Sequence, residues 1–183
     1  MTSTTRILYV GGLGRSGSTL LERALAQFPT VTGLGETVYM WQRGVANDEQ
    51  CGCGRRFASC DFWTAVGETA FGGWGRIDLD RVRELQERVD DVKRIHLLLD
   101  PRLGGSGFRS DLREYLDLYE RLYAAVREVT GSSVIVDSSK ITSLAYVLSH
   151  SEQIDLRLLH IVRDPRAVAH AWTKVVRRPE VLD

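Results

Sequence analysis

Long apolar runs and an excess of either charge are both absent from this sequence of 183 residues. The apolar run Ile7–Val10 is far shorter than the roughly 18 residues of a membrane-spanning helix. Lys and Arg number 24, as do Asp and Glu, so the formal net charge is 0 and a globally basic nucleic-acid-binding protein is excluded. Without a targeting segment or a membrane span, we expect a cytoplasmic protein.

Cysteine is also scarce, and the three residues present are close together in the sequence: Cys51, Cys53 and Cys60. An odd number of cysteines does not indicate a disulfide framework. A structural zinc site usually has four ligands, and the nearest histidine, His96, is far along the chain. The ligand count therefore favours a small loop of thiols, with one labile disulfide, over a metal site.

Short apolar segments alternate with amphipathic patterns, which predicts one α/β domain over residues 1–183, with a central parallel sheet and helices on both faces. We expect strands at Ile7–Val10, Val134–Val136 and Leu156–Val162, a short connection at Val31–Gly35, and helices at 18–28, 79–99, 110–130, 143–148 and 165–175. Residues 44–75 have weak periodicity and are expected to be irregular, packed by Phe57, Phe62, Trp63 and Trp74.

A glycine-rich loop, residues 12–19, separates the first predicted strand from the first predicted helix. Backbone N–H groups in such a turn, with the helix dipole behind them, bind an anion such as phosphate. A triphosphate-binding loop has lysine where this chain has Ser18, which weakens an ATPase or kinase interpretation. The sequence evidence for dinucleotide binding is also weak, because no acidic residue ends a second strand about 20 positions after the loop. We expect Ser16 or Ser18 to cap the helix, and a plain tight turn is the structural alternative.

A second cationic segment follows the third predicted strand. Between Arg157 and Arg178 there are six Lys or Arg residues and one acidic residue, Asp164. Arg163 falls at the carboxyl end of the strand, which is the edge where open α/β sheets bind ligands. A guanidinium binds a phosphate bidentately; the alternative is a surface ion pair between Arg163 and Asp164 or another carboxylate.

Together the two segments resemble the sulfotransferases that use 3′-phosphoadenosine 5′-phosphosulfate (PAPS). Gly14-Arg15-Ser16-Gly17-Ser18-Thr19-Leu20-Leu21 is similar to the 5′-phosphosulfate loop of that family, most closely in its tyrosylprotein and carbohydrate branches and in bacterial members. Val162-Arg163-Asp164-Pro165-Arg166-Ala167-Val168 is similar to its 3′-phosphate motif. The resemblance runs from Ile7 to about Val175 and implies a P-loop NTPase-like three-layer fold. The cysteine cluster with Trp63 is also similar to bacterial members.

The resemblance implies transfer of a sulfuryl group from PAPS to an acceptor hydroxyl or amine. Arg15 would contact the transferring group and the bridging oxygen. Gly14, the amides of Ser16, Gly17, Ser18 and Thr19, and the two hydroxyls of Ser18 and Thr19 would hold the 5′-phosphate. Arg163 would hold the 3′-phosphate.

The resemblance also implies two further catalytic residues. Glu36 matches the position of a general base in the tyrosylprotein branch; its structural alternative is a carboxylate that favours the dipole of a helix beginning near it. Lys140 matches a lysine-bearing segment at the end of a strand, and would be a second stabilising cation. His160 and His170 are alternative bases, although the strand pattern around His160 is more typical of a core histidine.

Two features depart from the family. Ala171 stands where the family commonly has a serine that binds the 3′-phosphate, and the chain ends at Asp183, where family members continue, so we expect the C-terminal portion of the family domain to be absent. Two other functions remain open: a phosphotransferase with a degenerate loop, in which Asp137 binds magnesium, and a non-catalytic nucleotide-binding remnant. The expected partner is a small-molecule, glycan or peptide acceptor, and neither nucleic acid nor metal is expected.

Overall fold

A parallel sheet of four strands forms the centre of the molecule. The computed structural model describes residues 4–174, and its strands lie in the order β2 (Val31–Gly33), β3 (Val134–Lys140), β1 (Thr5–Gly12) and β4 (Ile154–Ile161). All three strand pairings are parallel. Parallel strands need crossover connections, and here these connections contain the helices. The α/β class predicted from the sequence is confirmed.

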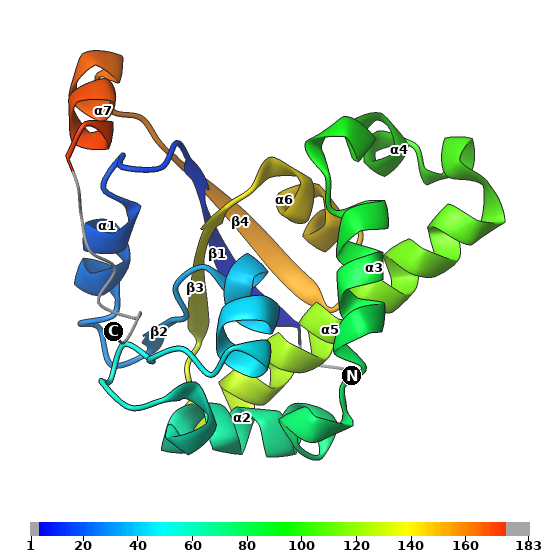
Figure 1. Cartoon of the computed structure of the whole chain (residues 1–183), viewed down its shortest axis with the longest axis horizontal. Coiled ribbons are helices and arrows are strands. Elements are labelled where there is room, and N and C mark those ends of the chain that lie inside the picture. The colour runs from blue at the N-terminus through cyan, green and yellow to red at the C-terminus, as the bar shows by residue number, and fades with distance from the viewer. Residues whose placement is uncertain (1–3, 175–183) are drawn as a thin grey trace.

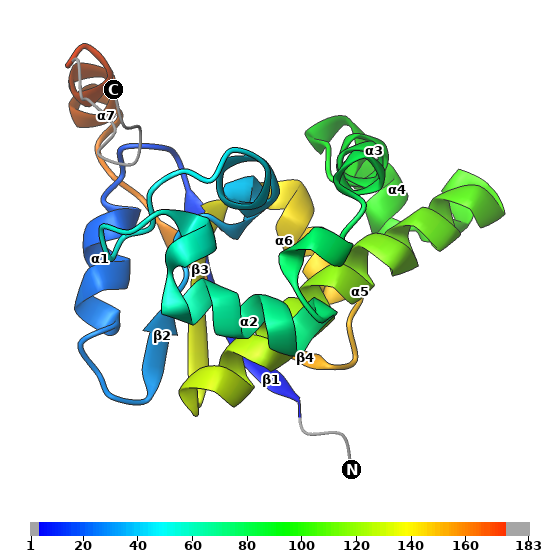
Figure 2. The ribbon, with the colours of Figure 1, turned by 60° about the horizontal axis from the view of Figure 1, so that its bottom comes forward.

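Helices lie on both sides of this sheet, which makes a three-layer arrangement. They are α1 (Ser18–Leu25), α2 (Asp61–Phe71), α3 (Leu79–Val89), α4 (Ile95–Leu99), α5 (Gly105–Thr130), α6 (Thr142–Ser149) and α7 (Pro165–Trp172). Figure 1 shows α1 on one side of the sheet and α5 and α6 on the other, and both views place α2 beside α5 (Figure 2). Within residues 4–174, no helix is both long and apolar enough to cross a membrane.

Shorter helical turns connect these elements. They are the 3-10 turns Thr37–Tyr39, Phe57–Ser59, Trp74–Arg76, Val92–Arg94 and Pro101–Gly104, and a π-helical segment Trp41–Ala46. The predicted irregular region 44–75 therefore contains a regular helix, α2, together with short turns. Its aromatic residues pack as expected, and the Phe57 and Trp63 rings stack with centroids 5.1 Å apart.

The core explains why the middle of β1, Ile7–Val10, is apolar. Ile7 and Tyr9 join one cluster with tyrosines that α5 buries at four-residue spacing, Tyr115, Tyr119 and Tyr123. Val10 is also fully buried, because a central strand of a parallel sheet is covered on both faces. The position of β1 between β3 and β4 therefore fixes the loop that follows it over the middle of the sheet.

One predicted helix, 79–99, is broken in the structure. α3 ends at Val89 and α4 begins at Ile95. Between them, the partly buried Asp90 carboxylate accepts hydrogen bonds from Tyr115 (3.2 Å) and Ser143 (2.6 Å), and the Asp91 side chain caps the next turn. Because these partners come from α5 and α6, the apolar periodicity of the segment could not reveal the break.

Other predicted boundaries are also wrong. Residues 31–33 form a strand rather than a connection, and α5 begins at Gly105 rather than near residue 110. The predicted buried third strand is β4, an edge strand among the described residues, with Leu158 67% and Val162 78% exposed. The predicted end of the last helix, near 175, lies outside the described residues, as do Arg177 and Arg178.

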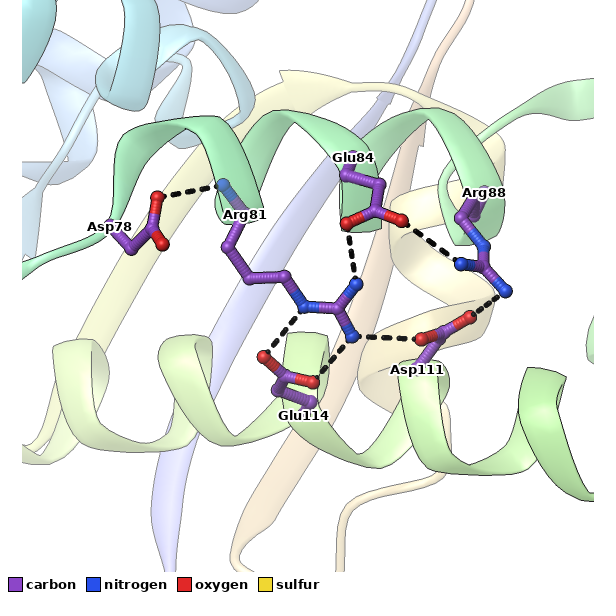
Figure 3. A network of polar contacts seen from close by, with 6 residues as sticks. All are labelled: Asp78, Arg81, Glu84, Arg88, Asp111 and Glu114. Carbon is purple, nitrogen blue, oxygen red and sulfur yellow. Dashed lines mark hydrogen bonds and ion pairs between the residues drawn. The ribbon is translucent and has the colours of Figure 1, made fainter.

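A charged network fastens α3 to α5 (Figure 3). Arg81 bonds Glu114 through two nitrogens (3.0 and 2.7 Å) and also reaches Asp111 and Glu84. Arg88 forms ion pairs with Asp111 at 2.8 Å and with Glu84 at 3.0 Å. Because the cations and carboxylates are engaged with one another, we interpret this surface as an interhelical contact.

The partly buried Asp90 carboxyl group should make the free energy of unfolding depend on pH. Burial raises the pKa of Asp90 from the ordinary 3.8 to about 6, and the nearby Asp137 and Asp91 add to this. Between these pH values the folded chain holds a proton that the unfolded chain has released, so stability falls as pH rises through this window. The difference between the two pKa values corresponds to about 3 kcal/mol.

Asparagine does not titrate, so the stability of the Asp90→Asn variant relative to the wild type should rise by about 3 kcal/mol between pH 3 and pH 8. Urea unfolding of both proteins at several pH values measures the change. Parallel stability profiles for the two proteins would contradict the raised pKa.

Candidate functional site

The carboxyl ends of β1 and β3 form the point where successive crossovers leave the sheet on opposite faces. The helix after β1, α1, covers one face, and the helix after β3, α6, covers the other (Figure 1). Open α/β sheets bind ligands in the crevice at such a point. A groove of about 390 Å³ opens here, lined by Gly11, Gly12, Lys140, Thr142 and His160 among others.

The glycine loop makes the wall of this groove on the side of β1. Gly12 has φ 143° and a Cβ there would lie 2.6 Å from the carbonyl oxygen of Ile161, so only glycine fits. Gly17, with φ 102°, is the N-cap of α1. No side chain caps this helix, so the predicted cap by Ser16 or Ser18 is wrong: the Ser16 hydroxyl instead donates to the carbonyl of Leu13 at 2.6 Å.

That geometry leaves the first amides of α1 without a capping side chain. Ser16 and Ser18 are buried, whereas Gly17 and Thr19 are exposed at the same turn. Backbone N–H groups at a helix start, without a capping oxygen, form a site for an anion. The uncapped start of α1 is therefore compatible with the phosphate binding that the sequence predicts.

The second cationic segment lies directly against this loop. The Nη1 of Arg163 donates to the backbone carbonyl of Arg15 at 2.9 Å. The predicted alternative, an ion pair between Arg163 and Asp164, is absent from the described residues, because Asp164 caps α7 and pairs with Arg166 at 2.6 Å. The Arg15 guanidinium lies 5.5 Å from the ring of Trp172 in α7. Two segments far apart in the sequence thus meet at one edge of the sheet.

The wall of the groove on the side of β3 carries Lys140. Here β3 has one residue more than β1, since Tyr9 pairs with Asp137 and Gly11 pairs with Lys140. Bulges of this kind re-aim side chains and are frequent beside active sites. The Lys140 ammonium donates to Glu36 and to the carbonyl of Ser138, the latter at 2.8 Å.

Glu36 therefore lies between two cations. Lys140 contacts one carboxylate oxygen of Glu36, and the Arg43 guanidinium lies 3.6 Å from the other. The Glu36 side chain is 33% exposed. The residue precedes the turn Thr37–Tyr39, so its structural alternative as a helix-start carboxylate is also compatible with this position. Two of the candidate catalytic residues, Glu36 and Lys140, are in direct contact.

Backbone strain coincides with the candidate cations. Among the described residues, only Arg15, Asp48 and Lys140 have positive φ without being glycine, with φ 67° at both Arg15 and Lys140. A left-handed conformation costs a residue with a side chain about 1–2 kcal/mol, and such strain is concentrated at functional sites. No sequence signal indicated this conformation at either residue.

Two buried carboxylates, Glu22 and Asp137, hold the elements around the site together. The sequence analysis did not single out Glu22. Glu22 of α1 accepts hydrogen bonds from the backbone N–H of Gly35 and from the hydroxyl of Ser138. Burial raises the pKa of Glu22, despite these two donors. The carboxylate joins α1 to the ends of β2 and β3, which fixes the chain just before Glu36.

The second is Asp137, at the level of the sheet where β3 bulges. Its Oδ1 accepts from the Ser139 N–H (2.8 Å) and hydroxyl (2.5 Å), and its Oδ2 accepts from Thr37 and from Tyr123 (2.5 Å). The residue has no exposed surface, and burial raises its pKa. All four donors come from the protein itself, so Asp137 is a structural group of the core.

The remaining predicted residues occupy the rim. His160 lines the groove and is exposed, so the expected core histidine is wrong; β4 is an edge strand and leaves this side chain uncovered. His170 and Ala171 both lie in α7, and His170 is exposed.

The three cysteines form a separate cluster. The Cys60 sulfur lies 3.6 Å from both Cys51 and Cys53, and the three sulfurs are within 4.8 Å of one another. Burial raises the pKa of Cys51 to about 11, whereas a hydrogen bond from the backbone of Arg55 lowers that of Cys53. Spacing had indicated the loop of thiols, but not that the three sulfurs converge.

Comparison with known proteins does not assign this chain to a family. No protein-family model, no characterised protein and no solved structure matches this chain.

Proposed function

We propose that this chain binds PAPS across the carboxyl edge of its sheet and transfers the sulfuryl group to an acceptor hydroxyl or amine. One observation carries the proposal: Arg163 donates to the carbonyl of Arg15, so the cation proposed for the 3′-phosphate adjoins the loop proposed for the 5′-phosphosulfate. One adenosine with two phosphate-bearing ends can bridge two such neighbouring sites. The position of both at the topological switch point supports the same conclusion.

Each end of the nucleotide has a suitable set of donors. The amides of the glycine loop, from Gly14 through Thr19, would surround the 5′-phosphate, aided by the hydroxyls of Ser18 and Thr19. A guanidinium has five N–H donors, and within residues 4–174 the side chain of Arg163 makes one hydrogen bond, to Arg15. Its other donors would bind the 3′-phosphate. Ala171 adds no hydroxyl there, so Arg163 carries more of this recognition.

The transfer step needs charge compensation and a base. A bond forms between the acceptor oxygen or nitrogen and sulfur, while the bond from sulfur to the bridging phosphate oxygen breaks. Arg15 and Lys140 would compensate the negative charge that develops on that bridging oxygen. The acceptor proton would pass to Glu36, whose carboxylate Lys140 and Arg43 hold in place. Positioning and charge compensation are the main demands of such a transfer.

The phosphotransferase alternative has less support. It needs Asp137 as a magnesium ligand, but four protein donors already occupy the two oxygens of this buried side chain. It also needs the loop lysine that Ser18 replaces. Neither the engaged Asp137 nor Ser18 argues against PAPS as the bound nucleotide.

Calorimetric titration tests the proposal through Arg163. The wild-type chain should bind adenosine 3′,5′-bisphosphate more tightly than ATP with magnesium. Arg163→Ala should weaken binding of the bisphosphate about 10- to 100-fold, because a hydrogen bond to a charged group contributes about 1.5–3 kcal/mol. Binding of AMP, which has no 3′-phosphate, should be unchanged.

Arg166→Ala is the matched control, since it removes a neighbouring guanidinium that already pairs with Asp164. It should leave the affinity for the bisphosphate unchanged. Binding of ATP with magnesium but not of the bisphosphate would favour a phosphotransferase. Bisphosphate binding with no sulfated product from a broad acceptor panel would leave only the non-catalytic alternative.

A further inference from the structure

The cysteine cluster is placed where two local structures converge. Cys51 and Cys53 lie in a tight turn closed by hydrogen bonds from the Cys51 N–H to the carbonyl of Arg55 (2.7 Å) and from the Gly54 N–H to the carbonyl of Cys51 (2.8 Å). Cys60 is the N-cap of α2 and is 3% exposed. Backbone hydrogen bonds of the turn, rather than any contact between sulfurs, thus set the positions of the first two thiols.

The spacing of the sulfurs matches a tetrahedral metal site. Zinc binds thiolates at about 2.3 Å, which makes an edge between two sulfurs of about 3.8 Å in a tetrahedron. Cys60 lies at 3.6 Å from both other sulfurs. A disulfide joins two sulfurs at about 2.05 Å, and it would leave one of the three thiols unused. All three cysteines are free thiols in the structure.

Two carboxylates close to the cysteines in sequence, Asp48 and Asp61, are already engaged. Asp61 pairs with Arg55 at 2.7 Å, and Asp48 accepts from the Ala58 N–H at 2.8 Å and lies 3.6 Å from Arg56. Among the described residues, the three thiols are the one group of at least three metal-binding side chains that comes together. Cys53 is exposed, so solvent reaches the cluster at this thiol.

We propose that Cys51, Cys53 and Cys60 bind one Zn²⁺ as thiolates, with the fourth position taken by water. Cys60 and Phe57 both belong to the buried core, and Cys60 directly precedes α2. The binding energy of the metal would hold the turn of residues 50–60 against the start of α2, as structural zinc does in small motifs. The inference is independent of the proposed transferase function.

Metal analysis of the full chain, purified with a phosphine reductant and without chelator, tests the site. We expect one zinc per chain. After exchange, Co²⁺ should give thiolate charge-transfer bands and the intense visible bands of tetrahedral coordination. Cys53→Ser should reduce the affinity for Zn²⁺, measured against a chromophoric chelator, by more than about 100-fold, since even loss of an outer partner of a ligand costs about 10- to 100-fold.

Cys53 is the residue to change, because its exposure makes a folding defect avoidable, whereas Cys60 is buried. Asp61→Asn is the control, since it removes an adjacent carboxylate with 82% exposure that is not a proposed ligand, and it should leave the Co²⁺ bands intact. The proposal is wrong if the wild-type chain takes up no Zn²⁺ or Co²⁺, if Cys53→Ser binds as tightly as wild type, or if mass spectrometry of the chain finds a disulfide in place of the metal.

Discussion

Replacing Arg15 by glycine should slow sulfuryl transfer from PAPS about 100- to 1,000-fold without lowering the stability of the fold. The rate falls because the guanidinium would no longer compensate charge on the bridging oxygen. Stability is retained because Arg15 has φ 67°, a conformation that glycine adopts without strain. Transfer of labelled sulfuryl groups to an acceptor panel measures the rate, and thermal unfolding measures the stability.

Two further variants separate charge from geometry. Arg15→Lys keeps the charge but loses the planar fork, so it should fall between wild type and Arg15→Gly. Arg23→Ala removes an exposed cation from the far end of α1 and should leave the rate unchanged. Equal turnover by Arg15→Gly and wild type would remove Arg15 from the mechanism.

Asp137→Ala should lower the free energy of unfolding by about 4 kcal/mol. Three side chains, Thr37, Tyr123 and Ser139, would lose a buried acceptor, and each orphaned donor costs about 1–3 kcal/mol. Part of that cost is recovered where a hydroxyl finds another partner, such as the one between Thr37 and Ser139 at 3.3 Å. Urea unfolding near neutral pH gives the value.

The control for this variant is Asp155→Ala, because Asp155 forms only surface ion pairs with Arg6 and Arg157. Its removal should cost less than about 1 kcal/mol. Asp137→Asn keeps the shape of the side chain and should cost less than Asp137→Ala. If Asp137→Ala cost no more than Asp155→Ala, the role of Asp137 as a structural core group would be wrong.

The parts of the fold that the sequence predicted are those fixed by local pattern. The glycine loop between strand and helix follows from residues 7–28 alone, since an apolar run, a glycine cluster and a helical stripe are adjacent there. The break after Val89 and the strand Val31–Gly33 depend on partners elsewhere, Tyr115 for the first and β3 for the second. Short segments of this kind have too little sequence pattern for their secondary structure to be predicted from the sequence alone.

In the candidate site, too, local sequence indicated some features, whereas others depend on the tertiary structure. Residue types and spacing indicated Arg15 and Arg163 separately, but only the strand order brings them into contact. The contact between Glu36 and Lys140 depends on a bulge in β3, and the pattern of that strand gives no sign of an extra residue. The buried Glu22 was missed because a carboxylate in an amphipathic helix is ordinarily exposed to solvent.

The central position of β1 has a consequence for biosynthesis. β1 leaves the ribosome before both of its neighbours, β3 and β4, since Ile7 pairs with Ile135 and with Leu156. Until those segments are translated, the nascent chain has an apolar strand without hydrogen-bonding neighbours, which is a state that chaperones protect. The glycine loop that follows β1 therefore gains its final shape only after β3 and β4 have been translated.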